Sequence, residues 1–312
     1  MHKHYPEPIR ADDNLFEFAI GFLQIMPYKY VAHDPRIGQL NVRMVEMDQR
    51  GENIVFIKTP QETKTCNSTE NFTRDHQDSA FSRNITKFIC PDTSKVEFLG
   101  TMISPVHKYL HLELLACENK VLRATPGYEN DTCATSGEVT DFFNRHMLVG
   151  YVANNFVDKT EFSESPIRTL NDLLFYEQLN FVEHVRKEIQ LNYNEVELKD
   201  SYFQIWSQQQ TEFYNFLSVD HSVSQSLRTI NPTAYFQAQF RLNNRVNEYE
   251  RVVYSFFDMA GDIGGFMEAV YIFFVFGIGA YANRMFFASV IQDVFKVRLE
   301  AHGQTIFELQ KA

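Results

Sequence analysis

Residues Ile263–Ala282 read IGGFMEAVYIFFVFGIGAYA, and Glu268 is the only acidic or basic residue among them. A helix over this stretch would be roughly 30 Å long, which matches the hydrocarbon thickness of a bilayer. We therefore predict a transmembrane helix over residues 256–283. This helix would divide the chain into a large domain, residues 1–255, and an amphipathic tail, residues 284–312, on the other side of the membrane. The alternative is that the same helix continues straight through the tail.

The region before this helix has the pattern of an antiparallel β-sheet. Residues 234–242 read AYFQAQFRL, in which Ala234, Phe236, Ala238, Phe240 and Leu242 alternate with Tyr235, Gln237, Gln239 and Arg241. One apolar and one polar face along a strand are typical of a sheet with one face in water. We predict that Tyr235 lies on the polar face.

Similar alternation places further strands and one helix along the large domain. The expected strands lie at residues 16–25, 41–47, 53–58, 110–117 and 147–153, and the expected helix lies at residues 136–147. Residues 59–92 are polar, and we predict a long glycosylated loop there. The predicted fold class is α+β: a β-rich antiparallel ectodomain, then a C-terminal transmembrane helix and an amphipathic helical tail.

The large domain holds all four cysteines: Cys66, Cys90, Cys117 and Cys133. Four cysteines allow three disulfide connectivities. We favour the sequential pairs Cys66–Cys90 and Cys117–Cys133 because they close short loops. The cysteines are too far apart for a local zinc site, so no metal is expected.

Four N-x-[ST] sequons are interleaved with these cysteines, at Asn67, Asn71, Asn84 and Asn130. N-linked glycans need lumenal loops, and disulfides need an oxidising compartment. Together they predict a glycoprotein whose large domain lies outside the cell or in the lumen of the endomembrane system. The alternative is an Asn/Thr-rich loop in an organelle where sequons have no meaning.

Charge agrees with this orientation. The formal net charge is -11, yet the segment after Ala282 carries the basic residues Arg284, Lys296, Arg298 and Lys311 against three acids. Basic residues close to the end of a membrane helix favour its cytosolic side. The acidity of the large domain argues against nucleic acid as a partner, because phosphates need a basic surface.

Two features of the membrane segment point to helix contacts or function. Small residues four apart, Ala260 with Gly264 and Gly261 with Gly265, allow two helix backbones to approach closely. The alternative is a flexible joint at the membrane surface. Glu268 is a candidate functional residue because ionisable groups are costly in lipid. The alternative is that its side chain reaches the nearby interface.

No nucleophile, phosphate-loop or zinc-protease signature occurs, so we predict no enzymatic activity, no catalytic residue and no cofactor. His107 and His111 are four residues apart and would share a helical face, but a third metal ligand is missing nearby. Asp220 and His221 are adjacent, and we interpret them as loop residues rather than as part of a catalytic arrangement.

Several residues carry a resemblance to a known family. They are Asp258, the pair Gly264-Gly265, the run Phe273–Phe276, the segment Val290–Lys296, the Phe-rich stretch Phe16–Phe22 and Tyr249-Glu250. The chain resembles a family of predicted transmembrane proteins of ciliate protists, which have a cysteine-containing ectodomain. Members of that family carry another membrane helix before the first strand, and this chain departs from that pattern. The resemblance implies no assigned activity, so no functional residues carry over from it.

The combined expectation is a membrane-anchored glycoprotein that acts in binding or assembly through its ectodomain and its membrane helix. Its partners would be membrane lipid and a protein, or a second copy of itself through the helix. One alternative is an ion-channel or transporter subunit, with Glu268 as the residue to test. Another is an accessory subunit of an organellar membrane complex.

Overall fold

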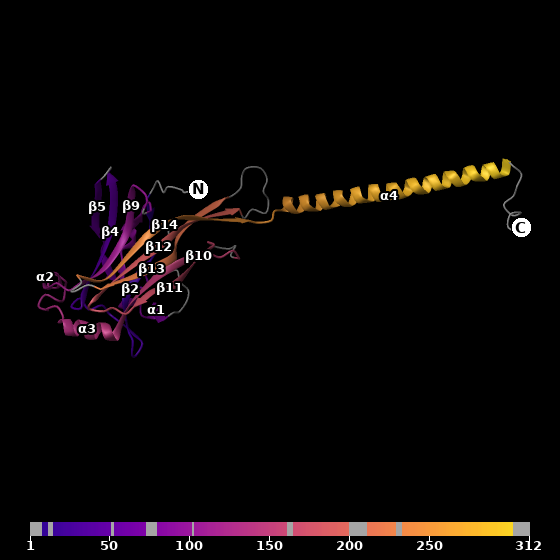
Figure 1. Cartoon of the computed structure of the whole chain (residues 1–312). Coiled ribbons are helices and arrows are strands. Elements are labelled where there is room, and N and C mark those ends of the chain that lie inside the picture. The colour runs from indigo at the N-terminus through magenta and orange to yellow at the C-terminus, as the bar shows by residue number, and fades with distance from the viewer. Residues whose placement is uncertain are drawn as a thin grey trace. The chain divides into compact units, whose positions relative to one another are not determined.

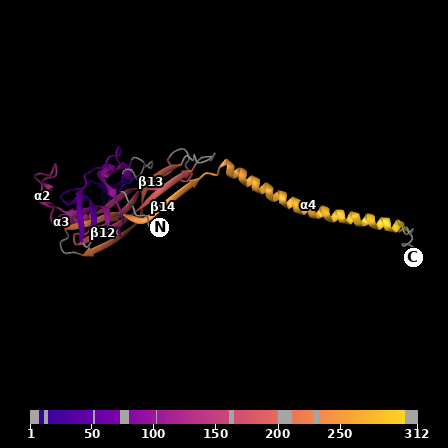
Figure 2. The same cartoon turned by 90° about the horizontal axis from the view of Figure 1, so that it is seen from above.

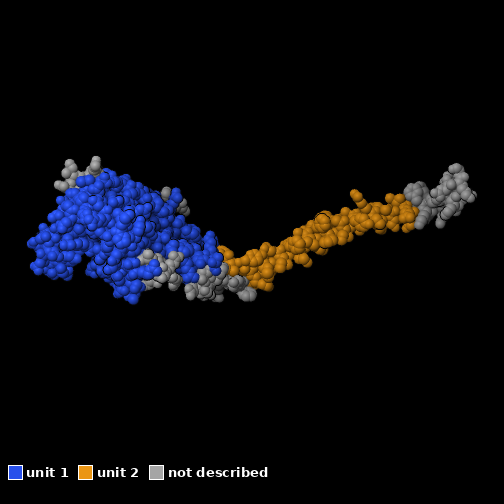
Figure 3. Space-filling model, turned by 90° about the horizontal axis from the view of Figure 1, so that it is seen from below, with its two compact units in different colours: residues 1–198, 212–251 blue, residues 199–211, 252–312 orange. Residues whose placement is uncertain are grey.

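The computed structural model describes residues 8–11, 15–50, 53–72, 80–101, 103–160, 165–199, 211–228 and 233–301. The chain divides into two compact units (Figure 3). The first unit holds residues 1–198 and 212–251, and the second holds residues 199–211 and 252–312. The first unit contains the sheets and the second contains one long helix, which agrees with the predicted α+β class.

Two six-stranded, mostly antiparallel sheets form the first unit (Figures 1 and 2). One, here the β14 sheet, has the order β13 (Glu212–Arg228), β12 (Glu183–Lys199), β14 (Ala234–Val252), β9 (Val106–Ala116), β4 (Gly38–Arg50) and β5 (Asn53–Pro60). The other, here the β2 sheet, has the order β11 (Ile167–Glu177), β10 (His146–Val157), β2 (Phe18–Gln24), β7 (Ile89–Pro91) and β6 (Thr63–Thr65), with β3 (Lys29–Val31) paired to β2.

Smaller elements complete the unit. A short sheet pairs β1 (Ile9–Arg10) with β8 (Glu97–Phe98). The helices are α1 (Ala80–Arg83), η1 (Ile85–Lys87), η2 (Thr93–Lys95), α2 (Asn119–Leu122) and α3 (Ser136–Arg145). A capping box between Thr135 and Glu138 begins α3, and Val139 and Phe143 bury its apolar face.

The main core lies between the two sheets, as the alternation predicts. Leu110, Leu112 and Leu114 of β9 are fully buried and belong to one hydrophobic cluster with residues of β2. Across the core, the rings of Phe18 and Phe240 are 4.6 Å apart. Because successive strand residues point to opposite faces, the polar residues between these leucines point away from the core.

Tyr235 is an exception to this alternation, and the prediction that it lies on the polar face is wrong. Its side chain is buried in the main core and lies beside Phe143 of α3, with 5.0 Å between the ring centroids. The β14–β9 register shifts between Ala234 and Phe236, which turns the intervening residue inward.

The predicted loop at residues 59–92 is instead ordered in its described part, residues 59–72 and 80–92. It contains β6 and β7, which are strands of the β2 sheet, and α1 and η1, whose side chains Phe81 and Ile85 join Phe72 and Phe88 in a layer on Ala19 and its neighbours. These apolar residues are spaced irregularly among polar ones, so no helix or strand period shows in the sequence. The β2 sheet therefore has apolar contacts on both faces.

The structure pairs the cysteines as favoured, joining Cys66 to Cys90 and Cys117 to Cys133. The first disulfide closes the layer on the β2 sheet, with a sequence separation of 24 residues. In the chain-entropy account, a loop of this length contributes about 3 kcal/mol by restricting the unfolded chain. We expect the double variant Cys66→Ser/Cys90→Ser to lose about this much free energy of unfolding, as measured by denaturant titration. A loss below about 1 kcal/mol would contradict this account.

The second unit consists mainly of α4 (Phe256–Ala301), a single 46-residue helix. Ser255 and Asp258 begin it with reciprocal hydrogen bonds: Asp258 N–H donates to Ser255 Oγ at 3.1 Å, and Ser255 N–H donates to Asp258 Oδ2 at 2.9 Å. The helix continues through residues 283 and 284, where we expected the membrane helix to end and a separate amphipathic tail to begin. It is about 70 Å long at 1.5 Å per residue, and residues 302–312 lie outside the described part of the chain.

Candidate interaction site

Polar side chains of four neighbouring strands gather on the face of the β14 sheet that points away from the core. The order β12, β14, β9 and β4 brings them side by side. We call this group the polar network; its members are Arg43, Tyr109, His111, Glu113, Arg186, Glu188, Gln237, Gln239 and Arg241. Most are long side chains that shield one another from solvent. Glu113, Gln239 and Arg241 are each less than a tenth exposed.

Glu113 is the acceptor at one end of the network. Its carboxylate accepts hydrogen bonds from the Arg43 guanidinium and from Gln237 Nε2, the latter at 3.0 Å. His111 Nε2 lies 3.7 Å from Glu113 Oε1. Three strands, β4, β9 and β14, thus converge on one buried carboxylate.

Gln239 and Glu188 hold the other end. Gln239 Oε1 accepts hydrogen bonds from Arg186 Nη2 at 3.2 Å and from Arg241. Glu188 Oε1 accepts from Arg186 Nη2 at 3.0 Å and lies 3.9 Å from Arg241 Nη1. The Arg241 guanidinium also stacks over the Tyr109 ring, 4.7 Å from its centroid.

The histidines on this face are held neutral. Burial is the main cause that lowers the pKa of His111 to about 4. The charge of Glu113 opposes this shift, and the positive charges of Arg43, Lys58 and Arg186 add to it. Burial lowers the pKa of His107 to about 4 as well, with Arg241 acting in the same direction. Burial also lowers the pKa of His184. At neutral pH the three imidazoles therefore add no charge to the network.

The side chains of the network are paired with one another. Each arginine of the network faces a carboxylate, and the side chains hold one another in place. Arg186 and Glu188 are the most accessible charged groups, with side chains 37% and 34% exposed. The donors and acceptors of the network are therefore satisfied largely by one another, and Arg186 and Glu188 are its main charged groups that reach solvent.

The network also allows a test by substitution. Removing the Glu113 carboxylate leaves the Arg43 guanidinium, whose side chain is 21% exposed, without its acceptor. We expect Glu113→Ala to lower the free energy of unfolding by about 2 kcal/mol, and Glu113→Gln to lower it by less. The matched control is Glu70→Ala, which removes an exposed partner of Lys64 and should leave the unfolding midpoint unchanged. Equal effects of Glu113→Ala and Glu70→Ala would contradict the network.

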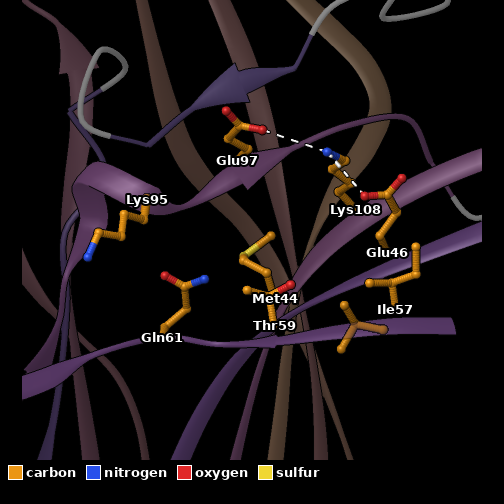
Figure 4. A pocket seen from close by; sticks show the side chains of 9 residues that line it. Met44, Glu46, Ile57, Thr59, Gln61, Lys95, Glu97 and Lys108 are labelled. Atoms are coloured by element: carbon orange, nitrogen blue, oxygen red, sulfur yellow. Dashed lines mark ion pairs between the residues drawn. The ribbon is translucent and has the colours of Figure 1, made fainter.

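A second candidate is a cavity of about 150 Å³ near the β4–β5 edge (Figure 4). Lys108 Nζ lies 3.2 Å from Glu46 Oε2 and 3.7 Å from Glu97 Oε2, so these three charges of the lining pair with one another. Lys95, which also lines the cavity, pairs with Glu62 and Asp92. Small-molecule sites usually measure about 300–1,000 Å³. We assign no ligand to this cavity.

The two histidine-containing pairs noted in the sequence both lie on strands. His107 and His111 lie on strand β9 rather than on a helix, so four residues separate them by about 13 Å along the strand. No group of three metal-ligating side chains occurs in the described residues. Asp220 and His221 lie in strand β13 rather than in a loop. There, Asp220 Oδ2 is 2.9 Å from His221 Nδ1 and accepts a bond from Asn243 Nδ2 at 2.9 Å.

The predicted glycosylation sites lie at the surface of the first unit. Asn67 and Asn130 are exposed, and Asn71 and Asn84 are partly exposed. Asn67 follows Cys66 directly, and Asn130 lies in the loop that Cys117–Cys133 closes. Thr73, which completes the Asn71 sequon, lies outside the described residues. Glycan attachment at these positions stays a prediction.

The predicted packing residues of the membrane segment lie in the first turns of α4. Ala260, Gly261, Gly264 and Gly265 are all exposed, as is Glu268. A Cβ atom built on any of the three glycines would meet no neighbour within 4 Å. This surface is therefore open to close approach by another helix, while the identity of that helix and the role of Glu268 stay predictions.

Comparison with known proteins places the chain in a family. Residues 19–243 match the family described as "Uncharacterised 80 kDa protein N-terminal domain". The chain belongs to this family. The match spans both sheets from β2 into β14 and ends before α4, and the description of the family names no activity. No curated protein and no solved structure matches the chain.

This family membership bears on the resemblance seen in the sequence. The matched family is uncharacterised, which agrees with the lack of an assigned function that the resemblance implies. The assignment to ciliates stays a prediction. α4 lies outside the matched residues, so its role rests on its own composition. Phe256–Val294 of α4 is long and apolar enough to cross a membrane, with none of its most apolar window buried in the described structure.

The sequence alone does not reveal the polar network. The polar residues of β9 and β14 are visible as alternating positions, but their convergence with Arg43 and Arg186 depends on a strand order that no local pattern contains. The start of α4, by contrast, carries a local signal, because Ser255 and Asp258 form the S-x-x-D signature of a helix N-terminus.

Proposed function

We propose that this protein is a membrane-anchored glycoprotein that acts in binding and assembly, without catalysis of its own. α4 would cross the membrane, and the first unit would lie outside the cell or in the lumen of the endomembrane system. The polar network and the small-residue surface of α4 would contact protein partners.

The observation that carries the proposal is the exposed apolar helix that follows a disulfide-bonded domain. The exposed apolar surface along Phe256–Val294 is costly in water and favourable in lipid. Disulfides form and persist in oxidising compartments, which supports the placement of the first unit on the outer or lumenal side. N-glycans at Asn67 and Asn130 would require the same side.

Membrane insertion can be tested with two matched double variants of α4. Phe273→Asp/Phe276→Asp places charges in the middle of the predicted hydrocarbon span, at a cost of about 3 kcal/mol each. Phe286→Asp/Phe287→Asp places the same charges beyond Arg284. We expect the wild type and the second variant to stay in membranes through an alkaline carbonate wash, and the first variant to be released. Release of the wild type would contradict the proposal.

The assembly role can be tested on the same helix. Gly261→Leu/Gly265→Leu would block close helix approach, and Gly277→Leu/Gly279→Leu is a matched control outside the predicted contact. We expect only the first pair to lower the fraction of chain in complexes, measured by energy transfer between labelled chains in bilayers. Equal effects of both pairs would count against the contact.

A second candidate function, an ion-channel or transporter subunit, is favoured by one observation. Glu268 is an ionisable side chain within an otherwise apolar part of α4. If Glu268 lines an ion path, Glu268→Gln should lower cation conductance of the purified protein in planar bilayers. Unchanged conductance, or none in the wild type, would remove this candidate.

A further inference from the structure

The edge strand β5 exposes an unusual apolar run. Ile54, Val55, Phe56 and Ile57 are 54%, 42%, 55% and 47% exposed, and every residue of Asn53–Pro60 is exposed. These four consecutive side chains alternate between the two faces of the strand, so both faces are apolar. Scattered exposed apolar residues are ordinary on a protein surface, but a contiguous run on a sheet edge marks a contact site.

The free edge of β5 determines what kind of group can cover it. In the described residues β5 is hydrogen-bonded to β4 alone and ends the β14 sheet. Its other edge therefore carries N–H and C=O groups that a neighbouring β-strand would satisfy. The occupant is an extended strand, rather than a helix or a small ligand.

The opposite edge of the same sheet has a different composition. The exposed half of β13 carries Val223 and Leu227, 44% and 53% exposed, but polar residues separate them and Asp220 adds a charge, so no contiguous apolar run forms there. The centre of β5 has no charge, proline or bulge. The contrast favours the β5 edge over the β13 edge as a site for pairing with another strand.

We propose that β5 pairs with β5 of a second copy of this chain, antiparallel about a two-fold axis through Phe56. This register places Phe56 opposite Phe56, Val55 opposite Ile57 and Ile54 opposite Lys58, and it pairs residues 53–59. Pro60, which has no N–H to donate, falls outside the ladder. The β14 sheet of one copy then becomes continuous with the β14 sheet of the other copy across the axis.

Charge and side-chain pairing select this arrangement. A parallel in-register pair would set Lys58 against Lys58, whereas the two-fold pair separates these residues by four positions along the strand. Cross-strand pairs of aromatic and β-branched residues each add roughly 0.2–1 kcal/mol. The best partner for an uncharged Ile-Val-Phe-Ile strand is a strand of the same composition, and every copy carries one. The inference does not depend on α4 or on the proposed membrane location.

Disulfide trapping in the full-length, detergent-solubilised protein tests the register. Directly opposed residues in an antiparallel pair have Cα atoms about 4.5–5.5 Å apart, within reach of a disulfide. We expect Phe56→Cys to form covalent dimers under mild oxidation, at least tenfold more than Phe213→Cys on the β13 edge. Val55→Cys and Ile57→Cys should cross-link when mixed, and much less when each is alone.

A second measurement separates pairing from chance collision. Phe56→Lys places two like charges at the axis and should weaken self-association at least tenfold in analytical ultracentrifugation, while Phe213→Lys should not. Unfolding midpoints show that both variants are folded. The proposal is overturned if Phe56→Cys stays monomeric, or if all four cysteine variants cross-link equally. It is also overturned if Phe56→Lys associates as the wild type does.

Discussion

Phe240→Ala should destabilise the first unit by about 4 kcal/mol, at the upper end of what a single core truncation costs. Phe240 is fully buried on β14, and its ring packs edge-on against Phe16 at 5.8 Å and Phe18 at 4.6 Å. It therefore joins the β14 sheet to the β2 sheet. Removing a buried phenyl ring loses its transfer free energy and leaves a cavity that close-packed neighbours cannot fill.

Chemical denaturation with a fluorescence or circular dichroism readout would measure this loss. The matched control is Phe213→Ala, because Phe213 is 71% exposed on β13 and its truncation should change stability by about 0.5 kcal/mol or less. If Phe240→Ala cost no more than Phe213→Ala, the two sheets would not share one core.

Acidification should produce the second large effect. The pKa values of His107 and His111 fall from 6.5 to about 4 on folding, chiefly because both rings are buried. Between these values the unfolded chain binds more protons than the folded chain, so the free energy of unfolding falls as the pH falls. The contribution of the two histidines to the free energy of unfolding is fully present above pH 6.5 and is lost by about pH 4. We expect a loss of roughly 2 kcal/mol for each histidine between pH 7 and pH 5.

The matched variant for this prediction is His107→Gln/His111→Gln. It removes these two rings while keeping polar side chains on the same face of β9, so it should reduce the loss of stability between pH 7 and pH 5 by roughly 4 kcal/mol. His33 and His184, whose pKa values burial also lowers, keep a smaller dependence on pH in the variant. Unfolding free energies measured at half-unit pH steps would show this. An unchanged slope in the double variant would assign the acid sensitivity to other groups.

Local patterns predicted much of the architecture. The alternation of β9 and β14 identified the core-facing leucines and phenylalanines, since a strand with one buried face has a period of two. The helix at α3 and the two disulfides follow from equally local signals. Tyr235 shows the limit of this reasoning, because a register shift turned one residue inward against an otherwise regular pattern.

Features that depend on distant parts of the chain could not be predicted in this way. The layer over the β2 sheet joins four apolar side chains that carry no period, and only the fold shows that they share one surface. The polar network needs β12, β14, β9 and β4 to be neighbours, although they lie far apart in the sequence. The uninterrupted course of α4 past residue 284 is one of two structures that the sequence allows. The apolar face over residues 287–295, with Lys296 and Arg298 nearby, favours the other structure, a separate amphipathic helix.

The measurement that tests the central claim most directly is the intact mass of the natively purified, unreduced protein before and after enzymatic removal of N-glycans, with free thiols counted in parallel. A lumenal or extracellular first unit predicts a mass loss of several glycans and no free thiols, since Cys66–Cys90 and Cys117–Cys133 are both closed. An unshifted mass with reactive cysteines would contradict that placement and move the protein to an organellar complex or to the cytosolic face of a membrane.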